Sequence, residues 1–250
     1  MRTVAIVNQK GGVGKTTTTA NLAHAFALQG FKVAVLDFDP QAHLTASLGF
    51  AKREQSGLGD ILLNGVANQG LMIQARDNLI LLPAGTKLKQ VELTLHNADT
   101  ELNLQTGIAS LMQGQDILLI DCPPASGILI RYALSIVDEI LVPVAGDYLA
   151  LRGLSDLIGT LRGIASSQSR TFKQRIVITR FHRRRKLCWE IKDKLLEYFP
   201  GQLMATPIRE TSVLAESPSF GKTAFEYKRG NHGQIDYEAL AHDVINERVV

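Results

Sequence analysis

The chain has 250 residues, of which 45% are apolar and 20% are charged. This length and this mixed composition can bury a hydrophobic core and exclude an intrinsically disordered chain, so we expect a single domain over residues 1–250. The first ten residues carry too short an apolar stretch for a signal sequence, and nothing approaches the about 18 apolar residues of a membrane span. These features predict a cytoplasmic protein with no membrane contact.

The two cysteines, Cys122 and Cys188, are too few for a disulfide framework and are not spaced like a metal knuckle. We expect both to be free thiols that are at least partly buried.

The net charge of +3 is unevenly distributed along the chain. From Arg170 to Lys194 there are 10 Lys and Arg but only 2 acidic residues, a net +8 that leaves −5 for the rest of the chain. A stretch of this charge density favours a polyanionic partner.

Short apolar runs rich in β-forming residues alternate along the chain with longer stretches of helical spacing. The runs predict strands at 3–8, 32–37, 116–121, 139–144 and 175–180, and the stretches predict helices at 15–29, 128–137, 149–165 and 187–199. Such alternation is typical of an α/β fold with a mostly parallel, twisted sheet and helices on both faces. No low-complexity linker or internal repeat suggests a domain boundary.

Between the first strand and the first helix the chain reads QKGGVGKTT, at residues 9–17. Glycines here let backbone amides turn toward a phosphate, and the helix N-terminus adds partial positive charge. Lys15 can reach the β and γ phosphates, and the Thr16 hydroxyl suits Mg²⁺. The segment therefore predicts a phosphate loop for ATP and Mg²⁺, formed by Lys10, Gly11, Gly12, Val13, Gly14, Lys15, Thr16 and Thr17.

Acidic residues follow the second and third predicted strands, at the sheet edge where such folds bind ligands. Asp121 ends an apolar strand, and we assign it to Mg²⁺ through a bound water. Asp37 and Asp39 flank Phe38, so one carboxylate can face the phosphates while the other serves the loop. A purely structural capping role is the alternative for either residue.

The loop departs from the common phosphate-loop pattern, because Gln9 replaces the first glycine and Lys10 precedes the others. KGGVGKTTT resembles the deviant signature of the ParA/MinD family of ATPases. Further segments are similar to motifs of that family in the same order, namely LDFDPQAHLTASLG at 36–49, LLIDCPPA at 118–125, LVPVAGDYLALRGL at 141–154 and TPIRETSVLAESPSFGK at 206–222. Asp147 stands where many members carry Glu. Within the family, the chain most resembles ParA and Soj.

The resemblance implies roles that residue chemistry alone leaves open. It implies that Asp39 orients the attacking water and that Asp37 supports the metal site. It implies that Lys10 crosses to the phosphates of a partner subunit, so that ATP is held between the two chains of a homodimer that separates after hydrolysis. Pro207 and Arg209 are expected, from the resemblance alone, to provide backbone contacts to adenine.

The basic run Arg183, Arg184, Arg185 and Lys186 begins the helix predicted at 187–199. It is either a solvated charged face or a surface that contacts DNA phosphates without reading bases. The resemblance aligns Arg184 with a DNA-contacting position of Soj-like members. A second such position is Val213 here, and Arg180, Lys192 and Lys194 are possible substitutes. We expect Trp189 to lie in the core rather than to stack on bases.

The function implied is that of a ParA-type ATPase that coats nucleoid DNA and positions a cargo until a ParB-like activator or cargo adaptor stimulates hydrolysis. One alternative is a MinD-like membrane switch, although the C-terminal YEALAHDVINERVV offers little bulky apolar surface. Another is a metabolic or metal-delivery ATPase, although Cys122 is poorly placed for a metal at a dimer seam. No operator-binding domain is expected before the phosphate loop, so autorepression is not expected.

Overall fold

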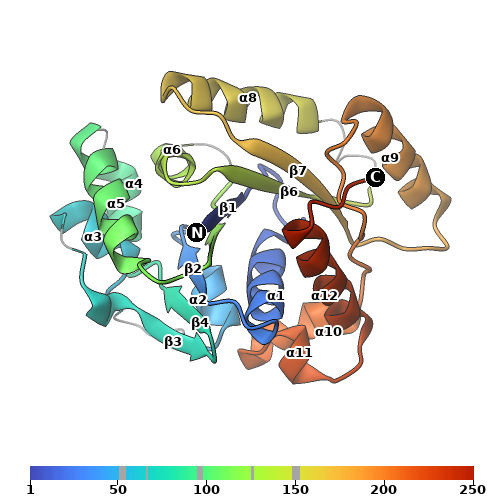
Figure 1. Cartoon of the computed structure of the whole chain (residues 1–250), viewed down its shortest axis with the longest axis horizontal. Coiled ribbons are helices and arrows are strands. Elements are labelled where there is room, and N and C mark those ends of the chain that lie inside the picture. The colour runs from blue at the N-terminus through green and yellow to red at the C-terminus, as the bar shows by residue number, and fades with distance from the viewer. Residues whose placement is uncertain (51–54, 66, 95–97, 125–126, 148–152) are drawn as a thin grey trace.

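Figure 1 shows the computed structural model, which describes residues 1–50, 55–65, 67–94, 98–124, 127–147 and 153–250. The described residues contain a seven-stranded sheet in the order β3-β4-β2-β5-β1-β6-β7. All neighbouring strands are parallel except β3 and β4. The strands are β1 (Arg2–Ile6), β2 (Val33–Asp37), β3 (Ile73–Arg76), β4 (Leu79–Leu82), β5 (Ile117–Asp121), β6 (Glu139–Ala145) and β7 (Lys173–Thr179). The predicted mostly parallel sheet is confirmed.

Helices cover both faces of the sheet (Figure 1). One face is packed by α1 (Lys15–Leu28), α2 (His43–Ser47) and α12 (His232–Ile245). The other is packed by α3 (Leu58–Asn64), α4 (Leu88–Thr94), α5 (Ala98–Leu111), α6 (Ile128–Ser135), α8 (Leu154–Ser167) and α9 (Lys186–Tyr198). The short helical segments are η1 (Gln69–Leu71), α10 (Ser212–Glu216), η2 (Ser217–Phe220) and α11 (Ala224–Tyr227).

The central strands are buried on both faces, which explains their continuous apolar sequences. Val4 and Ile6 belong to the core under α1, whereas Ala5 and Val7 belong to the core on the opposite face. Successive strand side chains point to opposite faces, so both sets must be apolar when helices cover both. All five residues of β5 are buried, including its last residue, Asp121.

The strand order places β1 at a point where the chain changes direction across the sheet. After β1 the chain builds one half of the sheet through β5, and it then builds the other half with β6 and β7. The register aligns Asp121 with both Ile6 and Asp37, so the exit of β1 and two carboxyl groups lie at the same edge. Ligands of open parallel sheets bind at such a switch point.

The predicted helices are present, with small shifts at their ends. The helix predicted at 15–29 ends at Leu28, that at 128–137 ends at Ser135, and that at 187–199 begins one residue earlier. The helix predicted at 149–165 is described from Leu154 onward, because residues 149–152 lie outside the described ranges. Within those ranges, no helix combines the length and apolarity needed to cross a bilayer.

Candidate nucleotide-binding site

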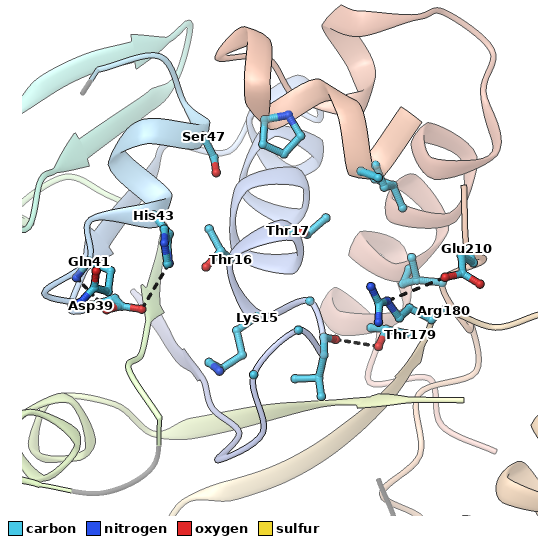
Figure 2. Close-up of a pocket in the computed structure, with 18 of the residues that line it drawn as sticks. Lys15, Thr16, Thr17, Asp39, Gln41, His43, Ser47, Thr179, Arg180 and Glu210 are labelled. Carbon is cyan, nitrogen blue, oxygen red and sulfur yellow. Dashed lines mark hydrogen bonds and ion pairs between the residues drawn. The ribbon is translucent and has the colours of Figure 1, made fainter. Parts of the chain in front are cut away.

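A cavity of about 770 Å³ lies at the C-terminal edge of the sheet, around the start of α1. Its floor is the phosphate loop, residues 11–17, and its walls come from the segments that follow β2 and β7 and from residues 208–218. Figure 2 shows Asp39 and His43 on one side of the cavity and Arg180 and Glu210 on the other. The predicted loop residues Gly11 to Thr17 all line this cavity.

The loop is shaped by Gly14 and tied to the sheet by Thr179. Gly14 precedes α1 with a φ of 89°, a left-handed conformation that favours glycine. The hydroxyl of Thr179, at the end of β7, donates a 2.7 Å hydrogen bond to the Val13 carbonyl. No side chain caps the N-terminus of α1, so its amides and its positive dipole end are available to an anion.

Lys15 is the first residue of α1 and lines the cavity. Its Nζ donates to the backbone carbonyl of Lys10 at 3.3 Å, across the phosphate loop. The ammonium therefore already lies against the loop that would surround the phosphates.

Thr16 and Asp121 form the hydrogen-bonded pair beside the cavity. The Thr16 hydroxyl donates to Asp121 Oδ2 at 2.7 Å, and the Thr19 hydroxyl donates to Oδ1 at 3.3 Å. Burial, followed by the charge of Asp37, raises the pKa of Asp121 to about 8. A cation bound beside Asp121 would favour its ionised form.

The residues around Thr16 fit a hydrated divalent cation. Mg²⁺ usually takes one or two protein oxygens and completes its coordination with phosphate oxygens and water. The described residues contain no cluster of three or more His, Cys, Asp or Glu side chains able to hold a metal. The Thr16 hydroxyl and the neighbouring Asp121 carboxylate, at the floor of the cavity, match the preference of Mg²⁺ for one or two protein oxygens.

Asp37 is fully buried at the end of β2 and does not line the cavity. Its Oδ2 accepts from the Thr45 backbone amide at 2.8 Å and from the Thr45 hydroxyl at 2.6 Å, while Oδ1 accepts from the Asp39 amide at 3.2 Å. Burial raises its pKa to about 6, against the hydrogen bonds from Thr45. Asp37 therefore anchors α2 directly and acts on Asp121 only through its charge.

Asp39 does line the cavity, two residues further along. Its Oδ1 accepts from the Gln41 amide at 2.9 Å, and its Oδ2 lies 3.8 Å from His43 Nδ1 (Figure 2). Asp37 thus holds the segment that follows β2, whereas Asp39 lines the cavity.

Lys10 differs from the other loop residues because its side chain does not line the cavity. Its Nζ forms a 2.8 Å ion pair with Asp147 Oδ1, just beyond β6, and both side chains are partly exposed. The expected position away from the protein's own phosphate site is consistent with this geometry.

Residues 208–211 form a wall of the cavity, whereas Pro207 does not line it. Arg209 thus lies at the cavity and Pro207 just outside its lining, and the adenine contacts expected of both stay a prediction. The Arg209 side chain is held by Asp236 of α12, with Nε 3.0 Å from Oδ1 and 2.9 Å from Oδ2. This ion pair fixes the backbone of the wall against α12.

Sequence reasoning missed several residues of the walls: Gln41, His43, Ser47, Glu210, Thr211, Leu214 and Tyr237. Gln41 and His43 lie within the segment 36–49, where the preceding aspartates were a usable signal. Glu210 carries no such signal, because its position beside the cavity depends on how residues 206–211 run along the end of β7.

The basic stretch is split by β7 into two groups. Arg170, Lys173 and Arg175 lie near the start of the strand, and residues 180–186 lie beyond its end. Arg183, Arg184, Arg185 and Lys186 are all exposed, and Arg185 occupies the N-cap position of α9 without a capping hydrogen bond from its side chain. Cations at a helix N-terminus oppose the helix dipole, so this placement does not serve helix stability.

One expectation about this region requires correction, and the DNA contact considered for Arg180 stays a prediction. Trp189 is 44% exposed and therefore is not a core residue, because α9 places it on the outer face beside the basic run. Arg180 is part of the nucleotide cavity wall, and its Nε lies 3.9 Å from Glu210 Oε1. Val213 is buried. The expectation for the cysteines is confirmed, since Cys122 and Cys188 are both free and buried.

The sheet, the switch point and the glycine-shaped loop before α1 define a phosphate-loop nucleotide-binding protein. A family model described as an AAA domain matches residues 1–174. The chain is 35% identical to the chromosome-partitioning ATPase Soj of Treponema pallidum over 98% of its length and 97% of that protein. It is 34% identical to the sporulation initiation inhibitor protein Soj of Bacillus subtilis, over 96% of the chain and 97% of that protein.

Among solved structures, the chain is similar to cobyrinic acid a,c-diamide synthase from Mycobacterium smegmatis with bound ATP analogue and magnesium. The TM-score is 0.84 at 27% identity, covering 99% of this chain and 95% of that one. Together with the relatives above, this shows that the chain belongs to the ParA/MinD family of ATPases, in the branch that contains Soj and ParA.

Proposed function

We propose that the chain is a ParA-type positioning ATPase that binds ATP with Mg²⁺ in the cavity and hydrolyses it to ADP and phosphate. The observation that carries the proposal is the Thr16–Asp121 hydrogen bond beside Lys15, at an uncapped helix N-terminus. These groups supply positive charge, a hydroxyl ligand and a carboxylate where a nucleoside triphosphate needs them.

Each residue of the site then has a distinct task. Lys15 neutralises the β and γ phosphates, and Thr16 and Asp121 would hold Mg²⁺, Asp121 through a bound water. The ion would supply positive charge for the transferred phosphoryl group. Asp39 orients the attacking water from the opposite wall, while Asp37 keeps α2 and the Asp39 loop in place.

The switch is the assembly of two chains around ATP. The Lys10 side chain is partly exposed, and its one ion pair among the described residues is with Asp147, so it can leave this pair for the phosphates of a partner subunit. An exposed ion pair contributes only about 0–1 kcal/mol, so its loss does not prevent the exchange. The resulting homodimer exists with ATP and separates after hydrolysis, which a ParB-like activator or cargo adaptor stimulates.

The ATP-bound dimer binds nucleoid DNA in the cytoplasm. The binding surface consists of Arg183, Arg184, Arg185 and Lys186. Arg185 NH1 lies 3.7 Å from Glu210 Oε2, and Lys186 Nζ lies 3.5 Å from Glu190 Oε1. Within the described ranges, Arg183 and Arg184 have no ion-pair partner. A surface with free guanidinium groups contacts phosphates without selecting a base sequence.

The test is the charge reversal Arg184→Glu, titrated against labelled random-sequence duplex DNA with ATP and with ADP. We expect the variant to lose DNA binding while its ATP-dependent dimerisation, measured by size-exclusion chromatography, is retained. Arg229→Glu, an equal charge reversal at an exposed position outside the basic run, is the matched control and should bind DNA like the wild type. Equal DNA binding by Arg184→Glu and the wild type would place the DNA surface elsewhere.

A second candidate follows from the likeness to cobyrinic acid a,c-diamide synthase, namely an ATP-dependent synthetase. Such an enzyme consumes ATP in step with an acceptor substrate. Sustained ATP hydrolysis by the purified chain without any acceptor, increased by duplex DNA, would favour the positioning ATPase over this alternative.

A further inference from the structure

The turn that carries the basic run, residues 182–186, joins the end of β7 to α9. Two backbone hydrogen bonds shape it: the Arg185 amide donates to the His182 carbonyl at 2.9 Å, and the Cys188 amide donates to the Arg185 carbonyl at 3.0 Å. The Arg183 carbonyl takes part in neither. It accepts instead a 2.9 Å hydrogen bond from the indole Nε1 of Trp189.

The indole that makes this bond is itself held in place. Its ring packs edge to face against Phe181, with ring centroids 5.2 Å apart, and Lys192 Nζ lies 5.6 Å from the ring centroid. Phe181 is buried, and its amide donates to the Ile208 carbonyl at 2.9 Å, so the ring rests on the edge of the sheet. Trp189 therefore connects the exposed turn to the rigid part of the molecule.

The turn at residues 182–186 needs a stabilising contact because its four consecutive cations repel one another. The Arg183 and Arg184 side chains are exposed, without ion-pair partners in the described ranges. A turn free to spread would have to be ordered when it meets a polyanion, and the lost conformational freedom would weaken binding. Holding the Arg183 carbonyl removes part of that cost in advance.

We propose that Trp189 is a positioning residue for the DNA-binding surface, acting through its indole N–H on residues 182–186. This inference rests on the proposed binding of duplex DNA by the basic run. The N–H and one side of the ring are engaged with the protein, so Trp189 orders the turn rather than reading bases.

Trp189→Phe isolates this role, because phenylalanine keeps an aromatic ring against Phe181 but has no N–H donor. Tyr198→Phe is the matched control: it removes a polar atom from an exposed aromatic residue of the same helix, at the end far from the turn. Each variant is titrated against random-sequence duplex DNA, in the presence of ATP, at several salt concentrations. Thermal unfolding and ATP affinity are measured in parallel.

We expect Trp189→Phe to raise the Kd for DNA about three- to tenfold, the effect of losing one hydrogen bond. The slope of log K against log salt is negative, and we expect its magnitude to decrease by about 0.9 for each phosphate contact no longer made. Its thermal midpoint and ATP affinity should match those of the wild type, and Tyr198→Phe should change nothing. Unchanged DNA affinity would overturn the inference, as would weaker binding with an unchanged slope and a lower thermal midpoint, which indicates lost packing.

The emission of Trp189 separates this failure from failure of the proposed function. Trp189 is the only tryptophan of the chain, and it is 44% exposed in the free protein. DNA bound on residues 182–186 covers it, and its emission should shift to shorter wavelength. If wild-type emission stays constant and Arg184→Glu binds DNA normally, the DNA surface is wrong. If emission shifts but Trp189→Phe binds like the wild type, only the positioning role is wrong.

Discussion

Lys15 belongs to helix α1 and also contacts the phosphate loop. It begins α1, and its ammonium bonds to the Lys10 carbonyl across the phosphate loop. Because the ammonium is already close to the loop, a bound triphosphate gains its charge without a large rearrangement of the side chain.

Replacing Lys15 with Ala should abolish ATP binding, because it removes the cation that neutralises the β and γ phosphates. Isothermal titration calorimetry with ATP and Mg²⁺ measures this directly. Lys10→Ala is an informative comparison, since Lys10 pairs with Asp147 outside the cavity. It should bind ATP normally but form less dimer. A Lys15→Ala protein with wild-type ATP affinity would contradict the assignment of the site.

Replacing Asp39 with Ala should leave ATP binding intact and stop hydrolysis, because the cavity loses the carboxylate that orients water but keeps Lys15 and Thr16. Size-exclusion chromatography with ATP should then show a dimer that persists for hours, whereas the wild type returns to monomer as ATP is consumed. An Asp39→Ala protein that remains monomeric and turns over ATP at the normal rate would count against this role.

At the scale of elements, the sequence patterns predicted the five parallel strands β2, β5, β1, β6 and β7 but not β3 and β4. The central strands are apolar throughout because both faces are covered. β3 is an edge strand with largely half-exposed residues, and it pairs with β4 through an irregular register, so it has no continuous apolar run. Helix α12 was also missed, because buried Asp236 and Asp243 interrupt its apolar face.

The same contrast applies to the site. The loop, Asp39 and Asp121 follow strands directly, so local sequence predicts their position. The wall with Arg180 and Glu210 could not be predicted, because it depends on the parallel contact of Phe181 with Arg209, two segments far apart in sequence. The pairing of Lys10 with Asp147 is equally non-local.

One contact between elements brings two cavity walls together. Gly49, just after α2, and Gly221, just after η2, approach so closely that a Cβ on Gly221 would lie 2.6 Å from the Gly49 Cα. Gly221 also has a φ of 63°. A side chain at Gly221 would clash with the Gly49 backbone. The clash can be relieved only if α2 and η2 move apart.

Gly221→Ala should therefore lower the free energy of unfolding by about 2–4 kcal/mol, combining backbone strain and overpacking. Urea denaturation measures the change. Gly230→Ala is the matched control, because Gly230 has a similar φ of 67° but nothing within 4 Å of an added Cβ. It should cost only about 1 kcal/mol. Equal losses for both variants would show that the approach to Gly49 does not matter.

At the scale of the whole molecule, charge and assembly act together. In the proposed function, a protomer would offer about three or four phosphate contacts and an ATP dimer roughly 6 to 8, and counterion release would make DNA affinity fall steeply with salt. Because residues 170–194 carry a net +8 and the rest of the chain a net −5, the remainder of the chain adds no net attraction for DNA.

We expect DNA affinity with ATP to fall about a thousandfold or more between roughly 50 and 200 mM salt, with little sequence preference. With ADP the monomer has half the contacts, so its slope should be about half as steep and its binding weak. Fluorescence anisotropy over a salt series, with two unrelated duplexes, tests both points. Equal slopes with ATP and ADP would separate DNA binding from dimerisation.

The burial of α1 affects where the molecule can open locally. Ten consecutive residues, Thr18 to Ala27, are buried, and the Thr18 hydroxyl lies 3.1 Å from that of Tyr237 in α12. Backbone amides in such a helix exchange with solvent only when the whole domain opens. We therefore expect the amides of Thr18 to Ala27 to be among the slowest to exchange. If the cavity binds ATP as proposed, we expect conformational responses in the cavity walls rather than in α1.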